Sequence, residues 1–322
     1  MTNRIRQSAN NDSRPSPLRF LGTALAFSVL LLAFHVKADT EVPQFHQRVQ
    51  ASPFEFSTLD FILFGAFILL AFELLQFLVQ NSGDWLGAKK IPVRGQHLDD
   101  FRTLDHTFIS FNKLATVPFV YFFFRYAYFE PNVIWDLDNI TLYNSVIPVP
   151  VLIIVYDFFY TILHWALHIK AIYGYIHKHH HRQKAPSRAN ADAVNVHPIE
   201  FFLGEYNHLM ALFLCCRCLN IQFHVLGCML MIAVGGVLAG LNHTRYDIVI
   251  SILGLHIYDS KVHDVHHRVP QSNYGQYIML WDYVFGSYRP YDSTDRVNKM
   301  SQLDPKTGKS LAHMKRLEKQ KL

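Results

Sequence analysis

Apolar runs nearly as long as a bilayer is thick recur along this chain. Four of them cover residues 20–36, 59–79, 114–129 and 146–167. A transmembrane helix needs about 20 mostly apolar residues, and within a bilayer only helices and closed barrels satisfy their backbone polar groups. A further run, residues 209–241, exceeds one crossing and carries Asn220 and Gln222 near its middle, which indicates a helical hairpin. We therefore expect an all-α integral membrane protein with about four spanning helices plus that hairpin.

Composition supports a membrane protein and limits its partners. Of 322 residues, 50% are hydrophobic and only 17% are charged. The net charge of +5 comes from basic residues beside the apolar runs, where they indicate topology, so we expect no nucleic-acid partner. One apolar stretch holds all four cysteines without zinc-finger spacing, and we expect free thiols at Cys215, Cys216, Cys218 and Cys228.

Eight histidines form three tight clusters beside the apolar runs. The clusters are His164 with His168, then His177, His180 and His181, and finally His263, His266 and His267. A helix places residues three or four apart on one face. Neutral imidazole binds iron, zinc, copper and nickel in preference to magnesium or calcium. Because one such ion takes only about four to six donors, the sequence predicts a histidine-rich cap that holds two metal ions at a membrane surface.

The order and spacing of these clusters closely resemble those of the fatty acid hydroxylase and sterol desaturase superfamily of membrane di-iron oxygenases. Asp157-Phe-Phe-Tyr160 precedes the first cluster and His197-Pro-Ile-Glu200 follows the second, as in that superfamily. The segment Asn273-Tyr-Gly-Gln-Tyr-Ile-Met-Leu-Trp-Asp282 looks most like sterol C5-desaturases. The resemblance covers residues 146–291.

The resemblance also implies a set of site residues. It adds His243, an isolated histidine between the second and third clusters, as a ninth metal ligand. Residues expected to support the ligands without binding metal are Asp157, Tyr160, His197 and Glu200. His179 falls at a variable position of the pattern and is left out of the ligand set, and His256 is a weaker candidate for a tenth ligand.

The activity that the resemblance implies is the O2-dependent hydroxylation or desaturation of a sterol or sterol precursor in lipid biosynthesis. Two iron ions would do the chemistry, although zinc could replace them on purification, and NAD(P)H would supply electrons through cytochrome b5 or an equivalent donor. Squalene epoxidation by a histidine-box enzyme and fatty-acyl or sphingolipid hydroxylation stay open. Outside enzymes, the alternatives are a metal transporter and a structural metal protein.

Four regions follow from these patterns. Residues 1–19 form a disordered basic N-terminus, and residues 20–145 form an N-terminal transmembrane region whose run 20–36 is either a signal anchor or a signal peptide. Residues 146–291 form the catalytic domain, and residues 292–322 form a polar, lysine-rich tail that we expect to be solvated. The short apolar run at 248–255 cannot cross a membrane, so we expect it to pack against the site.

Charge sets the expected orientation in the membrane. The connection at 80–113 carries five Lys or Arg residues, whereas the connection at 130–145 carries none. Because cytosolic loops are enriched in basic residues, we expect the histidine clusters to face the cytosol. The resemblance places such a multi-pass protein in the endoplasmic reticulum. The sequon Asn139-Ile-Thr141 would then be lumenal and open to glycosylation, whereas Asn242-His-Thr244 would be cytosolic.

Overall fold

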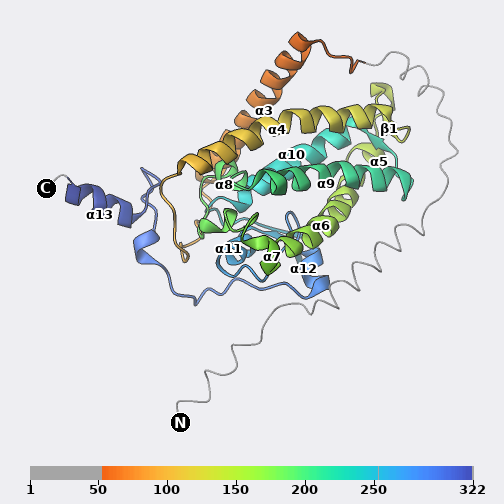
Figure 1. Cartoon of the computed structure of the whole chain (residues 1–322). Coiled ribbons are helices and arrows are strands. Elements are labelled where there is room, and N and C mark those ends of the chain that lie inside the picture. The colour runs from red at the N-terminus through yellow and green to blue at the C-terminus, as the bar shows by residue number, and fades with distance from the viewer. Residues whose placement is uncertain (1–52, 253, 321–322) are drawn as a thin grey trace.

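A computed structural model describes residues 53–252 and 254–320. Four helical segments in it are long and apolar enough to cross a membrane: Thr58–Trp85, Thr103–Phe129, Leu142–Leu167 and Val225–Asn242. They correspond to α3, α4, α5 with α6, and α10 in Figure 1. This mostly helical architecture confirms the expected fold class. The expected basic terminus at 1–19 and the apolar run at 20–36 lie outside the described residues.

Local sequence explains where the long helices begin. α3 (Thr58–Trp85) starts with a capping box, in which Ser57 and Asp60 each accept from the other's backbone N–H. α6 (Pro148–Leu167) and α9 (Pro198–Arg217) both start at a proline, whose missing N–H is tolerated in a first turn. Large apolar side chains stay exposed along α3, and a surface of this kind suits lipid: Leu59, Ile62, Leu63, Phe67 and Leu70.

The apolar run at 209–241 divides into two helices, as the hairpin prediction required. α9 ends at Arg217, and α10 (Val225–Asn242) follows after a turn. Asn220 lies in this turn with a left-handed φ of +50°. The short β2 (Phe223–His224) completes the turn and pairs in parallel with β1 (Val133–Ile134), just after α4. The four cysteines of this region are buried free thiols, as expected.

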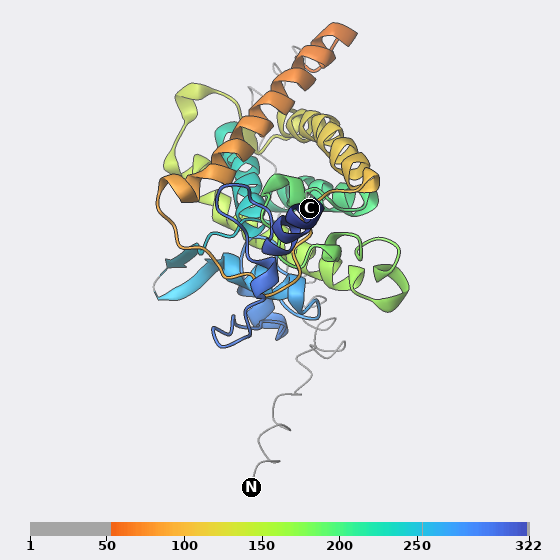
Figure 2. The same cartoon turned by 90° about the vertical axis from the view of Figure 1, so that its left-hand side faces the viewer.

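α6 is one of five long helices that pack as a ring. It packs against α9 and α10, while α4 (Thr103–Phe129) packs on α9, and α3 packs on both α4 and α10. Figures 1 and 2 show α3 projecting beyond its neighbours at one end. The main core consists of buried side chains from these helices, among them Phe119, Phe123, Leu152, Leu212 and Met231. This packing fixes the ends of α6 and α10, where histidine-bearing segments begin.

Short elements cap one end of the helix assembly. They are α7 (Lys170–Tyr173), the 3-10 helix η2 (His180–Arg182), α8 (Asn190–Ala193), α11 (Ser260–Arg268) and α12 (Leu280–Phe285). At the opposite end of α6, η1 (Leu137–Asn139) and α5 (Leu142–Ser145) connect it to α4. Figure 1 shows α5 and β1 well separated from α7, α8 and α11. The cap therefore gathers around the ends of α6 and α10 that carry histidines.

The apolar run at 248–255 does not pack against the histidines, contrary to our expectation. It forms β3 (Val249–Ile252), which pairs antiparallel with β4 (Leu255–Asp259) through an irregular register. The side chains of β3 are exposed, Ile252 most of all at 57%. β-branched residues favour strands, and here a two-stranded hairpin pairs their backbone while the side chains of residues 249–252 stay exposed. Ile248, just before β3, is partly buried against the main core.

The lysine-rich tail is docked along part of its length rather than solvated throughout. It contains η3 (Lys299–Ser301) and α13 (Leu311–Gln320). The Gln302 amide donates to the Val93 carbonyl over 2.7 Å, and the Ser310 hydroxyl donates to the Asp99 carboxylate over 2.6 Å. These bonds hold the tail on the connection between α3 and α4. α13 itself buries no residue.

Candidate metal centre

All nine histidines predicted as ligands lie in the cap or at the helix ends that meet it. α6 carries His164 in its last turn and ends at His168, and α10 ends at His243. η2 and the turn before it supply the second cluster. α11 supplies the third cluster, and Asp259 caps its N-terminus by accepting a backbone N–H.

The structure gathers these nine side chains into two buried groups. One group consists of His164, His168, His177, His181 and His266, and the other consists of His180, His243, His263 and His267. Within each group, the candidate ligand atoms lie within 4.8 Å of one another. Five and four imidazoles are reasonable donor numbers for one transition-metal ion each.

The second and third clusters each contribute to both groups. On α11, His263 and His267 are one helical turn apart and share a face, whereas His266 points toward the other group. The second cluster divides in the same way between His181 and His180. As a result, the two groups are neighbours: the rings of His181 and His267 have centroids 5.1 Å apart.

Hydrogen bonds at Nδ1 fix the protonation of five imidazoles. Four Nδ1–H groups donate to backbone carbonyls over 2.7 to 2.8 Å, from His164 to Tyr274, His266 to Ser272, His243 to Ala239 and His267 to Gln183. The Nδ1–H of His177 donates to the Glu200 carboxylate over 2.7 Å. Because these oxygens only accept, each neutral ring keeps its proton on Nδ1 and a lone pair on Nε2.

The Nε2 atoms of neighbouring rings point at one another. In the first group, Nε2 of His177 is 3.0 Å from that of His164 and 2.9 Å from that of His181. In the second group, Nε2 of His243 is 3.3 Å from that of His180 and 3.2 Å from that of His263. Nε2 of His263 is in turn 3.1 Å from that of His267. Nε2 of His164 and Nε2 of His177 both carry lone pairs, so they cannot hydrogen bond to each other. A cation among them suits this geometry.

Burial keeps the imidazoles uncharged, so that a proton does not take the place of such a cation. It lowers the pKa well below the ordinary value for His180, His181, His263, His266 and His267, and the surrounding imidazoles lower it further. Neither ring nitrogen of His168 has a hydrogen-bond partner among the described residues. The donor set therefore fits a transition metal in each group.

Two of the four predicted supporting residues, Glu200 and Tyr160, lie close to the first group, and a third, His197, acts at the start of the helix that carries Glu200. Glu200 touches a ligand directly through its bond to His177. His197 caps α9, since its Nδ1 accepts the Ile199 N–H, and so helps to place Glu200 in the first turn of that helix. The Tyr160 ring lies 5.4 Å from the ring of His164.

Asp157, the fourth supporting residue, acts on a ligand through a loop. Its buried carboxylate accepts three consecutive backbone N–H groups, from Gln276 to Ile278, over 2.9 to 3.0 Å. The same loop includes Tyr274, whose carbonyl accepts from His164. Asp157 therefore positions the loop that orients His164, and it contacts no imidazole of either group.

Two other histidines that we considered lie outside both groups. His179 pairs with Asn195 over 2.9 Å. His256 is exposed on β4, beside Ser251. Sequence reasoning missed the four carbonyl acceptors, because a backbone carbonyl carries no signature of residue type. Only Tyr274 fell in a segment that the resemblance had singled out.

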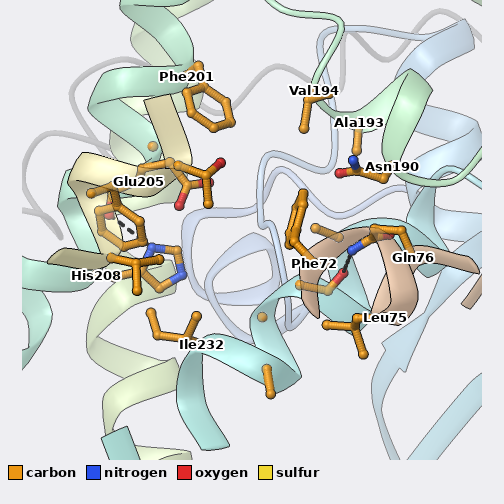
Figure 3. Close-up of a pocket in the computed structure, with 18 of the residues that line it drawn as sticks. Phe72, Leu75, Gln76, Asn190, Ala193, Val194, Phe201, Glu205, His208 and Ile232 are labelled. Atoms are coloured by element: carbon orange, nitrogen blue, oxygen red, sulfur yellow. Dashed lines mark hydrogen bonds between the residues drawn. The ribbon is translucent and has the colours of Figure 1, made fainter. Parts of the chain in front are cut away.

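An apolar cavity of about 370 Å³ lies beside the two groups, enclosed by α3, α4, α6, α9 and α10. Figure 3 shows Phe201 and Ile232 among its lining side chains. Glu200 and Tyr160 reach its wall from the first group, and Ala239 reaches it from the second, where its carbonyl holds His243. The volume falls within the range of roughly 300–1,000 Å³ that is usual for ligand pockets.

Comparisons with known proteins agree with this site. Residues 149–287 match the family model described as fatty acid hydroxylase. Methylsterol monooxygenase 1 of Gallus gallus is 28% identical over 152 residues, which are 47% of this chain and 49% of that protein. Lathosterol oxidase of Homo sapiens is 29% identical over 160 residues, 49% of this chain and 50% of that protein.

A more distant relative is the putative Delta(7)-sterol-C5(6)-desaturase 2 of Arabidopsis thaliana, 23% identical over 154 residues, 47% of this chain and 51% of that protein. The chain thus spans about half the length of the curated relatives it matches. No solved structure matches it. All nine clustered histidines lie within the segment that is similar to fatty acid hydroxylases, as the resemblance to that superfamily predicted.

Proposed function

We propose that this chain is an O2-dependent di-iron oxygenase that hydroxylates or desaturates a sterol or sterol precursor within a membrane. The observation that carries the proposal is the pair of converging, buried imidazole groups beside an apolar cavity. Bound iron would supply the dioxygen chemistry that oxidation of an unactivated C–H bond requires. The nine histidines would hold it, five at one ion and four at the other.

The surrounding residues would prepare the ligands and keep water away. Carboxylates and carbonyls at Nδ1 fix ring orientation and make the opposite nitrogen a better donor. Glu200 does this for His177, and the loop held by Asp157 does it for His164. The cavity between the long helices would accept the hydrocarbon part of a lipid and exclude bulk water.

A sterol-class substrate is supported by the names of the similar proteins, a methylsterol monooxygenase and a lathosterol oxidase. The enclosing helices present apolar side chains to their surroundings, so a lipid could reach the cavity from the bilayer. Squalene, fatty-acyl and sphingolipid substrates share that route and are separated by experiment below.

The proposal includes an endoplasmic-reticulum location with the histidines on the cytosolic side, where cytochrome b5 or an equivalent donor would deliver electrons. Its support is the position of the basic connection at 80–113. Lys184, just after the second cluster, donates its N–H to the carbonyl of Gln96 in that connection. The basic connection and the histidines therefore lie on the same side of the helices, which positive-inside topology makes cytosolic.

The test is lipid profiling of cells before and after deletion of the gene, followed by rescue. Wild type and His256→Ala should both restore the profile, because His256 is exposed and outside both groups. His266→Ala should not restore it, and the purified variant should contain less iron than wild type. An accumulating sterol precursor would identify the step.

Other outcomes assign other functions. Accumulation of squalene would indicate epoxidation, and a change confined to hydroxylated acyl chains would indicate fatty-acyl chemistry. An unchanged lipid profile, together with iron-loaded protein that consumes no O2 when supplied with electrons, would refute the oxygenase proposal and leave a non-enzymatic metal protein.

A further inference from the structure

A carboxylate faces the interior of the cavity. Glu205 lies on α9 and lines the cavity together with Phe201, Tyr156 and His208. Figure 3 shows Glu205 and His208 on one side of the cavity and Gln76 and Asn190 across from them. The walls between these polar groups are mainly apolar. A carboxylate in such surroundings is costly and indicates a functional role.

Glu205 has no hydrogen-bond donor among the described residues, and its half-buried side chain opens onto the cavity. Other buried carboxylates of the domain are satisfied: Asp157 accepts three backbone N–H groups, and Asp282 accepts two backbone N–H groups and the Ser287 hydroxyl. Glu200 accepts from His177 through one oxygen, and its other oxygen has no partner among the described residues. Since an unpaired carboxylate that faces a mainly apolar cavity costs free energy, Glu205 is suited to a donor that arrives with the ligand.

The position of Glu205 separates its role from that of Glu200. Five residues along a helix correspond to a rise of about 7.5 Å and a rotation of about 140°. Glu205 therefore does not point where Glu200 points, toward His177. Other polar groups line the same cavity: Tyr160, Tyr156, which donates to the carbonyl of Gly204, and His208, which donates to the backbone carbonyl of Glu205. These surroundings suit a neutral hydroxyl group on an otherwise apolar ligand.

We propose that Glu205 anchors a hydroxyl group of the lipid substrate in this cavity. The inference rests on the proposed function only in taking the cavity as the substrate site. A carboxyl group accepts a hydrogen bond from a hydroxyl whether or not it is ionised, so the anchor works in either state. The hydrocarbon part then fills the space lined by residues such as Phe72, Val120 and Ile232.

The experiment measures binding, without turnover, of two probes that differ only in the hydroxyl: 5α-cholestan-3β-ol and 5α-cholestane. Purified full-length wild type should bind the alcohol about 3- to 100-fold more tightly, the range expected for one hydrogen bond to a carboxyl group from its neutral to its charged form. Glu205→Leu should abolish the preference by weakening the alcohol alone. Glu205→Gln, which keeps an accepting oxygen, should retain part of it.

Ile232→Ala is the matched control, because it also lines the cavity but offers no polar atom. It should weaken both probes and leave their ratio unchanged. Equal binding of the two probes to wild type, or an intact preference in Glu205→Leu, would overturn the anchor. Iron content should be the same in all four proteins, which confirms that each variant is folded.

A second pair of probes, 1-octadecanol and octadecane, separates this inference from the proposed function. A Glu205-dependent preference for octadecanol, with no binding of the sterol, would uphold the anchor and contradict a sterol substrate. A Glu205-dependent preference for the sterol, in a protein that oxidises no lipid, would uphold the anchor and contradict the oxygenase.

Discussion

Glu200 joins the cavity to the candidate metal centre through a hydrogen bond. It lines the cavity and accepts from Nδ1 of His177. Loss of such a partner typically lowers metal affinity 10- to 100-fold. We therefore expect Glu200→Leu to give up iron to a chelator at about 10- to 100-fold lower chelator concentration than wild type, and Glu200→Gln to show a smaller change.

The control for this measurement is His256→Ala, which removes an exposed imidazole outside both groups and should leave chelator sensitivity unchanged. Wild-type iron retention in Glu200→Leu would mean that the bond to His177 does not tune the metal. The hydrogen bond between Glu200 and His177 would then have no effect on metal affinity.

Asp157 has a different role from Glu200, because it holds backbone rather than a ligand. An asparagine there keeps one accepting oxygen but turns an NH2 group toward a backbone donor. We expect Asp157→Asn to lower the free energy of unfolding by about 2–4 kcal/mol, measured by denaturant titration in detergent. Asp138→Asn, at an exposed carboxylate, should change it by less than about 0.5 kcal/mol. Equal effects of the two changes would contradict the proposed role of Asp157.

These residues also show which parts of the site could be predicted from the sequence. The nine histidines could be chosen from their spacing and from a family resemblance. How they divide into two groups could not, because it depends on the direction in which η2 and α11 lie, which is why His180 parts from His181. The partners of Asp157 lie about 120 residues away along the chain, and the backbone carries no pattern that would identify them.

The long helices could be predicted from the sequence more reliably than the segments between them. Runs of apolar residues predicted every long helix of the described chain, since a helix satisfies its own backbone whatever it packs against. The run at 248–255 failed because a short apolar stretch is compatible with a strand as well, and β3 with β4 needs no partner from the site. The residues that line the cavity could not be predicted, because they depend on how five helices pack together.

α10 packs closely against α5 at one of its glycines but not at another, and this difference can be tested. A Cβ on Gly227 would lie 2.7 Å from the backbone oxygen of Ser145, whereas a Cβ on Gly236 would meet nothing nearer than 3.5 Å, at Leu75. We expect Gly227→Ala to destabilise the protein by about 1–3 kcal/mol. Gly236→Ala should be neutral or stabilise it by up to about 1 kcal/mol, because alanine favours a helix.

Both glycine variants are compared by thermal unfolding in the same detergent. Each replaces a glycine of α10 by alanine, so differences in helix propensity cancel between them. A stable Gly227→Ala protein would show that the turn around Ser145 can move away from α10. The close approach would then not be required for the fold.

At the scale of the whole protein, the two ends of the helix assembly carry different elements. The histidines and the basic connection lie at one end of α6, and η1 with α5 lies at the other. Under the proposed topology the second end is lumenal. Within residues 53–320 each end carries one glycosylation sequon, so Asn139 and Asn242 report on which end meets the glycosylation machinery.

Asn139 is exposed in η1, and its sequon partner Thr141 is exposed as well. Asn242 is 5% exposed, and its side-chain amide donates to the Gln276 carbonyl over 2.7 Å. We therefore expect the protein expressed in eukaryotic cells to carry one N-linked glycan, removed by a glycosidase and absent from Asn139→Gln. Asn242→Gln should keep that glycan. A glycan on Asn242 would place the histidine end in the lumen, out of reach of a cytosolic electron donor, and would refute the proposed orientation.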